Sequence, residues 1–363
     1  MSANSMGKNF VITCFGESHG RCVGIVIDGC PPSLEMTEED VQKEINKRRP
    51  FSNQISTSRR EEDKVEILSG IFKGHTTGAP ICMLVWNKNV QSIVYEQIRW
   101  KPRPGHADYP AIERYRGFND YRGGGRFSGR ITVAFIMAGA VAKNLLKKIN
   151  VKVLAHTVEV AGIGLPEEPS LEQIKSNVYK NIMRCADRKI AKVMEKAVAD
   201  ARNEGDSVGG VVESIALNVP PGIGDPIFDA LDADMAKALF NIPGAKGVEF
   251  GVGFNVAKIK GSTNNDQYAI KNGKIITLTN NSGGVLGGLS TGMPLIVRTA
   301  FKPVSSIQKK QQTVDLRKGT TASIEIEGRH DACIVPRAVP VVESVVAIVL
   351  ADHLLRRNYF NSK

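Results

Sequence analysis

The chain has 363 residues, of which 42% are hydrophobic and 23% are charged, and it carries a formal net charge of +11. This composition excludes a disordered or fibrous chain, and the length allows one large fold or about two domains. The positive charge favours anionic partners, a class that includes nucleic acid, acidic lipid and phosphorylated metabolites.

Strands and helices alternate in the first part of the chain. Short β-branched runs bounded by glycine and proline predict strands over residues 10–15, 23–28, 65–68 and 81–86. Thr37 is a suitable N-cap for a helix over residues 38–49, which begins with acidic residues and ends before Pro50. The basic residues 47–49 fit either the negative end of the helix dipole or an anion-binding site, and both interpretations stay open.

The rest of the chain contains longer apolar helices. Their patterns predict helices over residues 132–149, 187–203, 226–239 and 335–357. The last of them accommodates Pro336 and Pro340 only in its first turn or before it. The apolar stretches 131–142 and 344–351 are shorter than the roughly 20 residues of a bilayer span, so no membrane segment is expected.

Cysteine usage and the N-terminal sequence indicate a cytoplasmic location. The six cysteines include no CxxC pair, so neither a zinc ribbon nor a redox dithiol is predicted. No signal peptide is recognised. A strand, a double-proline turn and a helix occur over residues 20–45 and again over 205–239. Because no long linker divides the chain, we expect one domain over residues 1–363 with two related lobes and a boundary near residue 205.

The strongest functional signal is the segment 103–130, which holds six arginines, six glycines and one histidine. Glycine lets the backbone approach a ligand closely, so that successive N–H groups can face an anion. Arginine adds a planar fork of donors that matches phosphate and carboxylate oxygens. The segment therefore predicts a binding site for a polyanionic small molecule, and a solvated charged turn is the alternative.

Titratable side chains lie in similar loops. His19 in GESHG and His106 in RPGHADY can each donate or accept a proton near neutral pH. Asp331 in GRHDAC is either a proton acceptor or a helix N-cap. Two later loops, residues 280–291 and 301–306, fit either phosphate binding or tight turns. No metal site is predicted, because no closed set of ligands is present.

Several long motifs resemble one enzyme family. FGESHG (15–20), RPGHADY (103–109), DYRGGGR (120–126) and GRHDACIVPRAVPVVES (328–344) resemble the hallmark segments of chorismate synthases, in the family order and across essentially the whole chain. The resemblance implies an α/β (α+β) fold, a layered αββα sandwich with helices outside two sheets and a pseudo-duplicated β-α-β topology. It also implies a homotetramer.

The resemblance implies a lyase of the shikimate pathway, which leads to the aromatic amino acids. The substrate would be 5-enolpyruvylshikimate 3-phosphate, converted to chorismate and phosphate by an anti 1,4-elimination. Reduced FMN would be required without net redox change. Either NADPH or an external flavin reductase would supply the reduced flavin. Neither nucleic acid nor a membrane is an expected partner.

Family positions assign roles to individual residues. His19 would protonate the departing phosphate, His106 would serve the flavin or substrate in protonated form, and Asp331 would assist deprotonation at C6. The substrate-binding positions are Arg48, Ser128, Arg130 and Arg329. The cofactor-binding positions are Arg48 (also a nicotinamide position), Arg126, Phe127, Ser128, Gly244, Ala245, Gly287, Lys302, Pro303, Val304, Ser305, Ser306 and Arg329.

The sequence departs from the family pattern at a few positions. Gln54 stands where an arginine is usual, which weakens one anion contact, and Phe127, Gly129 and Ala332 replace a common serine, alanine and proline. None of these changes removes a proposed acid, base or phosphate ligand. A nucleic-acid-binding protein is a weaker alternative, because only 6% of residues are aromatic. A flavin oxidoreductase is the nearer alternative, and it would consume nicotinamide with each turnover.

Overall fold

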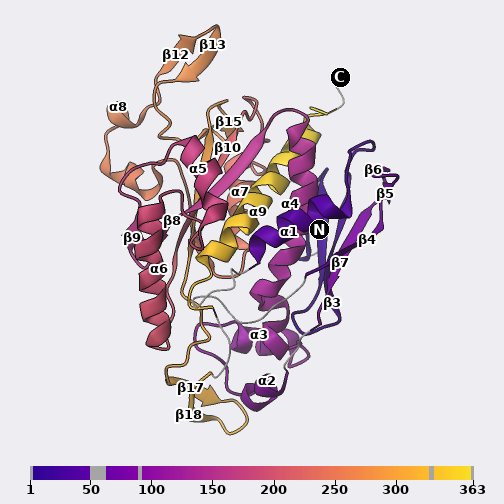
Figure 1. Ribbon diagram of the computed structural model, residues 1–363, viewed down its shortest axis with the longest axis vertical. Helices are drawn as coiled ribbons and strands as arrows, with labels where there is room; N and C mark the ends of the chain where they lie inside the picture. The colour runs from indigo at the N-terminus through magenta and orange to yellow at the C-terminus, as the bar shows by residue number, and fades with distance from the viewer. Residues whose placement is uncertain (1–2, 50–62, 89–91, 327–330, 361–363) are drawn as a thin grey trace.

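The computed structural model describes residues 3–49, 63–88, 92–326 and 331–360, and it is built around two five-stranded antiparallel sheets (Figure 1). The first sheet has the strand order β1 (Ser5–Met6), β2 (Val11–Gly16), β3 (Cys22–Asp28), β7 (Ile81–Trp86), β4 (Val65–Ser69). The second has the order β11 (Ala245–Phe250), β16 (Leu295–Phe301), β10 (Gly210–Leu217), β8 (Lys152–Val160), β9 (Ile163–Gly164).

Helices and small hairpins complete the described structure. The α-helices are α1 (Glu38–Arg48), α2 (Ile93–Ile98), α3 (Asp108–Tyr115), α4 (Thr132–Lys147), α5 (Leu171–Asn177), α6 (Arg188–Asn203), α7 (Leu231–Phe240), α8 (Gly261–Asn264) and α9 (Val335–Arg356). The 3-10 turns are η1 (Arg122–Phe127), η2 (Gly129–Ile131), η3 (Val178–Lys180) and η4 (Gly253–Lys258). The hairpins are β5–β6 (Ile71–Phe72, His75–Thr76), β12–β13 (Tyr268–Lys271, Lys274–Thr277), β14–β15 (Val285–Leu286, Leu289–Ser290) and β17–β18 (Gln311–Asp315, Thr320–Ile324).

The two sheets repeat one topology. In the first, β3 leads through α1 to β4, and β7 then pairs antiparallel with both strands and lies between them. In the second, β10 leads through α7 to β11, and β16 takes the same place between them. Each set ends in a long helix, α4 or α9. The β-α-β topology is therefore duplicated, and the second set begins with β8, upstream of the boundary near residue 205 that the sequence suggested.

The mixed α/β class is confirmed, but the expected order of layers is wrong. Helices α4 and α9 pack more extensively on each other than on any other element, and α4 also contacts β3 while α9 contacts β8 and β10. Figure 1 shows these helices in the middle of the molecule with the sheets on either side. Both helices are buried almost all round, so each must be covered on every face. A position between the sheets provides that cover.

Most predicted elements occur close to their predicted bounds. Helix α1 has the expected capping box, in which Thr37 Oγ1 accepts from Asp40 N at 3.3 Å and Asp40 Oδ2 accepts from Thr37 N at 3.2 Å. Helix α7 begins at Leu231, later than predicted, because the chain from Asp225 to Asp229 closes a turn through its own backbone hydrogen bonds.

Pro340 is placed differently from the prediction. It lies inside α9, beyond the first turn, while Pro336 lies in the first turn as expected. A proline there removes one helical N–H, and the carbonyl of Pro340 is bonded by Ser344 Oγ at 2.7 Å. Both α9 and the helical stretch 129–147 are long and apolar enough to cross a bilayer, and 94% and 78% of their apolar windows are buried inside the protein.

Candidate active site

A cavity of about 610 Å³ lies where loops and helix ends of the two halves meet. The first half contributes the β2–β3 loop, the end of α1, the loop before α3, and the stretch from η1 to the start of α4. The second half contributes the α7–β11 connection, the segment after β16 and the start of α9. The cavity size is within the usual range for small-molecule sites.

The cavity brings together most of the residues singled out in the sequence. These are His19, Arg48, His106, Arg126, Phe127, Ser128, Arg130, Gly244, Ala245, Lys302, Pro303, Val304, Ser305, Ser306 and Asp331. Gly287 lies in the β14–β15 turn and is not part of the cavity lining. Arg329 and Gln54 lie outside the described residues. Residues far apart in sequence thus converge on one hollow.

Cationic side chains dominate the described lining of the cavity. Eight are cations: Arg48, Arg49, Arg103, Arg126, Arg130, Lys246, Lys302 and Arg337. Only two are carboxylates, Asp63 and Asp331. Such a wall attracts anionic ligands and opposes their mutual repulsion. Of the basic residues 47–49, Arg48 and Arg49 line the cavity, which fits the anion-binding alternative, whereas Lys47 pairs with Glu44 at 2.6 Å.

The glycine run of η1 lies directly against both histidines. Gly123 and Gly124 have φ angles of 59° and 80°, in the left-handed region. A Cβ on Gly123 would lie 2.3 Å from His19 Cδ2, and a Cβ on Gly124 would lie 3.1 Å from His106 Cε1. These glycines therefore make room for the imidazoles, a role that the sequence did not reveal.

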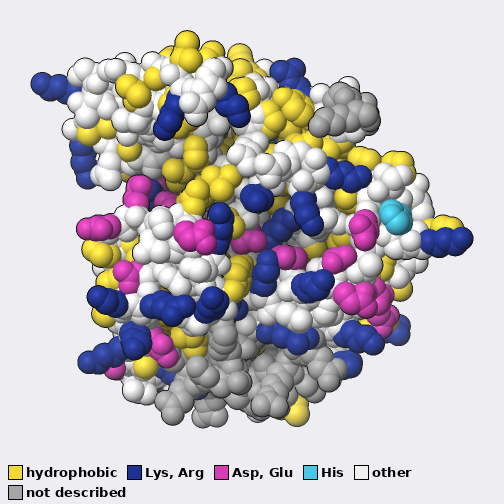
Figure 2. All heavy atoms as spheres, turned by 45° about the horizontal axis from the view of Figure 1, so that its top comes forward, with side chains coloured by type: hydrophobic (Ala, Val, Ile, Leu, Met, Phe, Trp, Pro, Cys, Tyr) yellow, Lys and Arg dark blue, Asp and Glu magenta, His cyan; other side chains and the backbone are white. Residues whose placement is uncertain are grey.

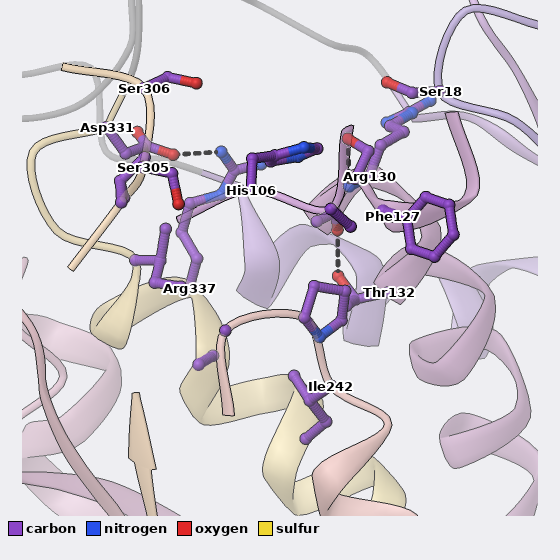
Figure 3. A pocket seen from close by; sticks show the side chains of 18 of the residues that line it. Ser18, His106, Phe127, Arg130, Thr132, Ile242, Ser305, Ser306, Asp331 and Arg337 are labelled. Atoms are coloured by element: carbon purple, nitrogen blue, oxygen red, sulfur yellow. Dashed lines mark hydrogen bonds and ion pairs between the residues drawn. The ribbon is translucent and has the colours of Figure 1, made fainter. Parts of the chain in front are cut away.

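His19 lies in a buried position, in contact with residues of and beside α2. Its Nδ1 lies 3.1 Å from Ser92 Oγ, and its ring meets Tyr95 edge-on with centroids 5.2 Å apart. His106 lies in a tight loop in which its Nδ1 is 2.6 Å from Asp108 Oδ1. In the view of Figure 3, the two serines of the β16–β17 segment and Asp331 lie to one side of His106.

Two of the predicted substrate arginines share a carboxylate that sequence reasoning missed. Asp63 bonds Arg130 Nη1 through Oδ1, and its Oδ2 lies 3.7 Å from Arg48 Nη1. Burial would raise the pKa of Asp63, but the two guanidiniums outweigh it and hold that pKa below its ordinary value. Arg130 also donates to Asn87 Oδ1, and Arg48 to Thr132 Oγ1, each at 3.0 Å. No local pattern around Asp63 signals this pairing, which links residues 67 positions apart.

Asp331 pairs with Arg337 of α9, Oδ2 to Nη1, at 2.7 Å (Figure 3). The N-cap of α9 is Ile334, which makes no side-chain cap, so Asp331 is not the cap that the sequence offered as one alternative. Arg337 is a second residue that the sequence reasoning missed. Its position in the first turn of a helix that begins shortly after Asp331 is the signal that could have found it.

A pair of lysines faces the cavity from the second half. Burial and the charge of Lys246 lower the pKa of Lys302 below its ordinary value. Lys302 Nζ bonds Gly105 O, which also accepts from Ser305 Oγ at 2.7 Å. An anion bound between the lysines would relieve their repulsion. Phe127 and Phe240 are both partly exposed and line the same cavity, so apolar surface is available for a planar ring.

Comparison with known proteins places these features in one family. The family model described as chorismate synthase matches residues 10–355. A chorismate synthase of Dehalococcoides mccartyi is 52% identical over 354 residues, covering 98% of this chain and 97% of its own length. A chorismate synthase of Methanococcoides burtonii is 51% identical over 361 residues, covering 99% and 98%. A solved structure titled "Crystal Structure of Chorismate Synthase" superimposes with a TM-score of 0.76 and 27% identity, covering 97% of this chain and 93% of that one.

Proposed function

This chain belongs to the chorismate synthase family, and we propose that it is the enzyme that converts 5-enolpyruvylshikimate 3-phosphate into chorismate and phosphate. The observation that carries the proposal is the convergence of two histidines, Asp331 and eight cationic side chains on one cavity. In the proposed anti 1,4-elimination, the C3–O bond to phosphate and the C6–H bond both break, and a new double bond forms. The step makes the enzyme a carbon–oxygen lyase.

The substrate suits the electrostatics of the cavity. It carries a phosphate and two carboxylates, and its charges need several donors in a site of low dielectric constant. Arg48, Arg130 and Ser128 are the donors that we assign to it, since all three line the cavity. Bidentate arginine contacts fix the orientation of carboxylates and phosphates as well as binding them.

The residues present also fit reduced FMN beside the substrate. The lysine pair Lys246 and Lys302 with Ser305 suits a phosphate, and Phe127 with the segment 240–245 offers an apolar wall to a ring system. When bound, reduced FMN would supply electron density to the breaking C–O bond and recover it, with no net redox change.

The chain's own acids and bases have separate tasks in this proposal. His19, buried and held at Ser92 and Tyr95, would donate a proton to the departing phosphate. His106 would act in protonated form beside the flavin. Asp331 would assist removal of the C6 proton, oriented by Arg337. Proton transfer by such positioned groups typically contributes about 100-fold to 10,000-fold to a rate.

We further propose a homotetramer in the cytoplasm, with FMN reduced by NADPH or by a separate reductase. The six cysteines are all free, which suits a reducing compartment. On the face seen in Figure 2, Lys and Arg are interspersed with Asp and Glu, a distribution that does not favour a nucleic-acid-binding stripe.

The test is an anaerobic incubation of the protein with 5-enolpyruvylshikimate 3-phosphate and dithionite-reduced FMN, with chorismate and phosphate measured together. We expect the two products in equal amounts from catalytic flavin, and a folded His19→Ala variant as the low-activity control. Folded protein that releases neither product would refute the proposal. Stoichiometric consumption of NADPH with each turnover would favour a flavin oxidoreductase instead.

A further inference from the structure

One carboxylate organises the whole RPGHAD loop. Asp108 Oδ2 accepts from Arg103 N at 3.0 Å and from Arg103 Nε at 2.8 Å, and Oδ1 accepts from Arg103 Nη2 at 2.8 Å. Oδ1 also lies 2.6 Å from His106 Nδ1. Burial alone would raise the pKa of Asp108, but the hydrogen bonds from Arg103 and His106 outweigh burial and hold that pKa well below its ordinary value.

The ionised carboxylate decides which imidazole nitrogen carries a proton. An ionised aspartate can only accept, so Nδ1 of His106 must be the donor in the 2.6 Å contact. Arg103 Nη2 lies 3.1 Å from the same nitrogen, which has no lone pair to offer once it carries its proton, and 3.4 Å from Nε2. The remaining nitrogen, Nε2, lies beside the Gly124 backbone in the cavity wall.

We propose that Asp108 is a positioning residue for His106: it fixes the ring with Nδ1–H on the carboxylate, and it offsets the charge of Arg103, which would otherwise oppose a second proton on Nε2. A carboxylate in hydrogen-bond contact favours the charged form of an imidazole, and its orientation fixes the tautomer. Asp108 thus acts on the ligand through His106 and does not line the cavity itself. The effect on turnover rests on the proposed function, whereas the state of the ring does not.

Other charged groups near His106 act in the opposite direction, and the structure limits them. Arg103 is engaged by Asp108, donates to Ser306 Oγ at 3.1 Å and lies over the Tyr95 ring at 5.6 Å. Lys302 reaches the loop at Gly105 O. Asp108 is the carboxylate in direct contact with the imidazole, at hydrogen-bond distance. A charge-assisted bond at that length is stronger than a neutral one.

The test measures the protonation of His106 without using turnover. Diethyl pyrocarbonate reacts with neutral imidazole, so its rate of reaction at His106, read by peptide mass spectrometry across pH, has a midpoint set by loss of the second proton. Asp108→Asn should move this midpoint to lower pH by about 1 to 2 units, the size expected for losing a neighbouring opposite charge. Asp108→Glu should return it most of the way. Exposed His75, which contacts Lys73 O, is the internal reference in each sample.

A matched control removes a different arginine-paired carboxylate. Asp120 pairs with Arg122 at 2.8 Å, so Asp120→Asn should leave the His106 midpoint unchanged. A midpoint in Asp108→Asn equal to that of the wild type would overturn the inference. If Asp108→Asn does not fold, Asp108→Ser should also move the His106 midpoint to lower pH, and an unchanged midpoint in that variant would likewise overturn the inference.

Turnover gives a second, separable readout. Loss of activity in Asp108→Asn should be smallest at low pH and grow as pH rises, because acid restores the protonated ring. Equal loss at every pH would mean a purely structural role and would also overturn the inference. A shifted midpoint in a protein that makes no chorismate would refute the proposed function and leave the role of Asp108 standing.

Discussion

Replacing the buried carboxylate of Asp63 tests how much it stabilises the protein by offsetting the positive charges of Arg48 and Arg130. Asp63→Asn keeps the size of the side chain but removes the negative charge between Arg48 and Arg130. At 3.7 Å and an effective dielectric constant of about 20, a carboxylate attracts one guanidinium by roughly 4 kcal/mol. Removing one partner of a buried pair typically costs about 3–5 kcal/mol. We expect a loss near the lower end, about 3 kcal/mol, because Asn87 and Thr132 still accept from the arginines.

The pH dependence separates this charge effect from a packing effect. Burial raises and the two arginines lower the pKa of Asp63, and the net result is below the ordinary value of 3.8. A carboxylate whose pKa is lowered by folding stabilises the folded state at pH values above its ordinary pKa. That stability is lost as the pH falls through the pKa of the folded state. The difference in unfolding free energy between wild type and Asp63→Asn should therefore be constant from pH 7 to about 5 and shrink below about pH 4.

Urea unfolding at several pH values measures the difference, with Glu39→Gln as the matched control. Glu39 is an exposed carboxylate in the first turn of α1, so its loss should cost less than about 1 kcal/mol. Inorganic phosphate should stabilise Asp63→Asn more than the wild type, because the arginines that have lost the Asp63 carboxylate should bind the anion more tightly. A ligand at 100 times its Kd adds about 2.7 kcal/mol to the state that binds it. An Asp63→Asn protein as stable as Glu39→Gln at pH 7, or equally impaired at every pH, would refute the reasoning.

Two further predictions concern the histidines and the loop that holds them. His19→Ala and His106→Ala should each lower turnover by about 100-fold to 10,000-fold with folding retained, measured by chorismate release and by circular dichroism; an unchanged rate in either would remove the corresponding proton-transfer role. Gly123→Ala should cost about 100-fold in turnover by displacing His19, and Gly124→Ala, whose methyl would lie 3.1 Å from His106 Cε1, should cost less. Gly117→Ala, with a similar φ of 77° but nothing within 4 Å of the new methyl, should cost only about 1 kcal/mol of stability; equal effects in all three would mean that backbone strain alone is responsible.

Local patterns in the sequence predicted the local structure well. The capping box of α1 and the Gly- and Arg-rich loops follow from residues close together in sequence, and the structure places them as expected. The pairings that set the charge state of the site could not be predicted in the same way. Arg103 meets Ser306 across 203 positions, and Asp63 meets Arg130 across 67. The predicted order of layers was wrong for a similar reason, because the sequence of an apolar helix indicates that the helix is buried but not which sheets cover it.

The duplicated topology explains why one cavity can hold so much positive charge. Equivalent places in the two halves line it: the chain leaving α1 and the chain leaving α7, and the starts of α4 and α9. The starts of α4 and α9 carry partial positive charge and favour anions, whereas the ends of α1 and α7 carry the opposite partial charge, so most of the positive field comes from the cationic side chains. Before any ligand binds, Asp63 and Asp331 offset part of this charge by pairing with arginines of the cavity lining. Asp108, which does not line the cavity, pairs with Arg103, which does. The anions of the proposed substrate and cofactor would complete this neutralisation, so we expect the site to be most stable when both are bound.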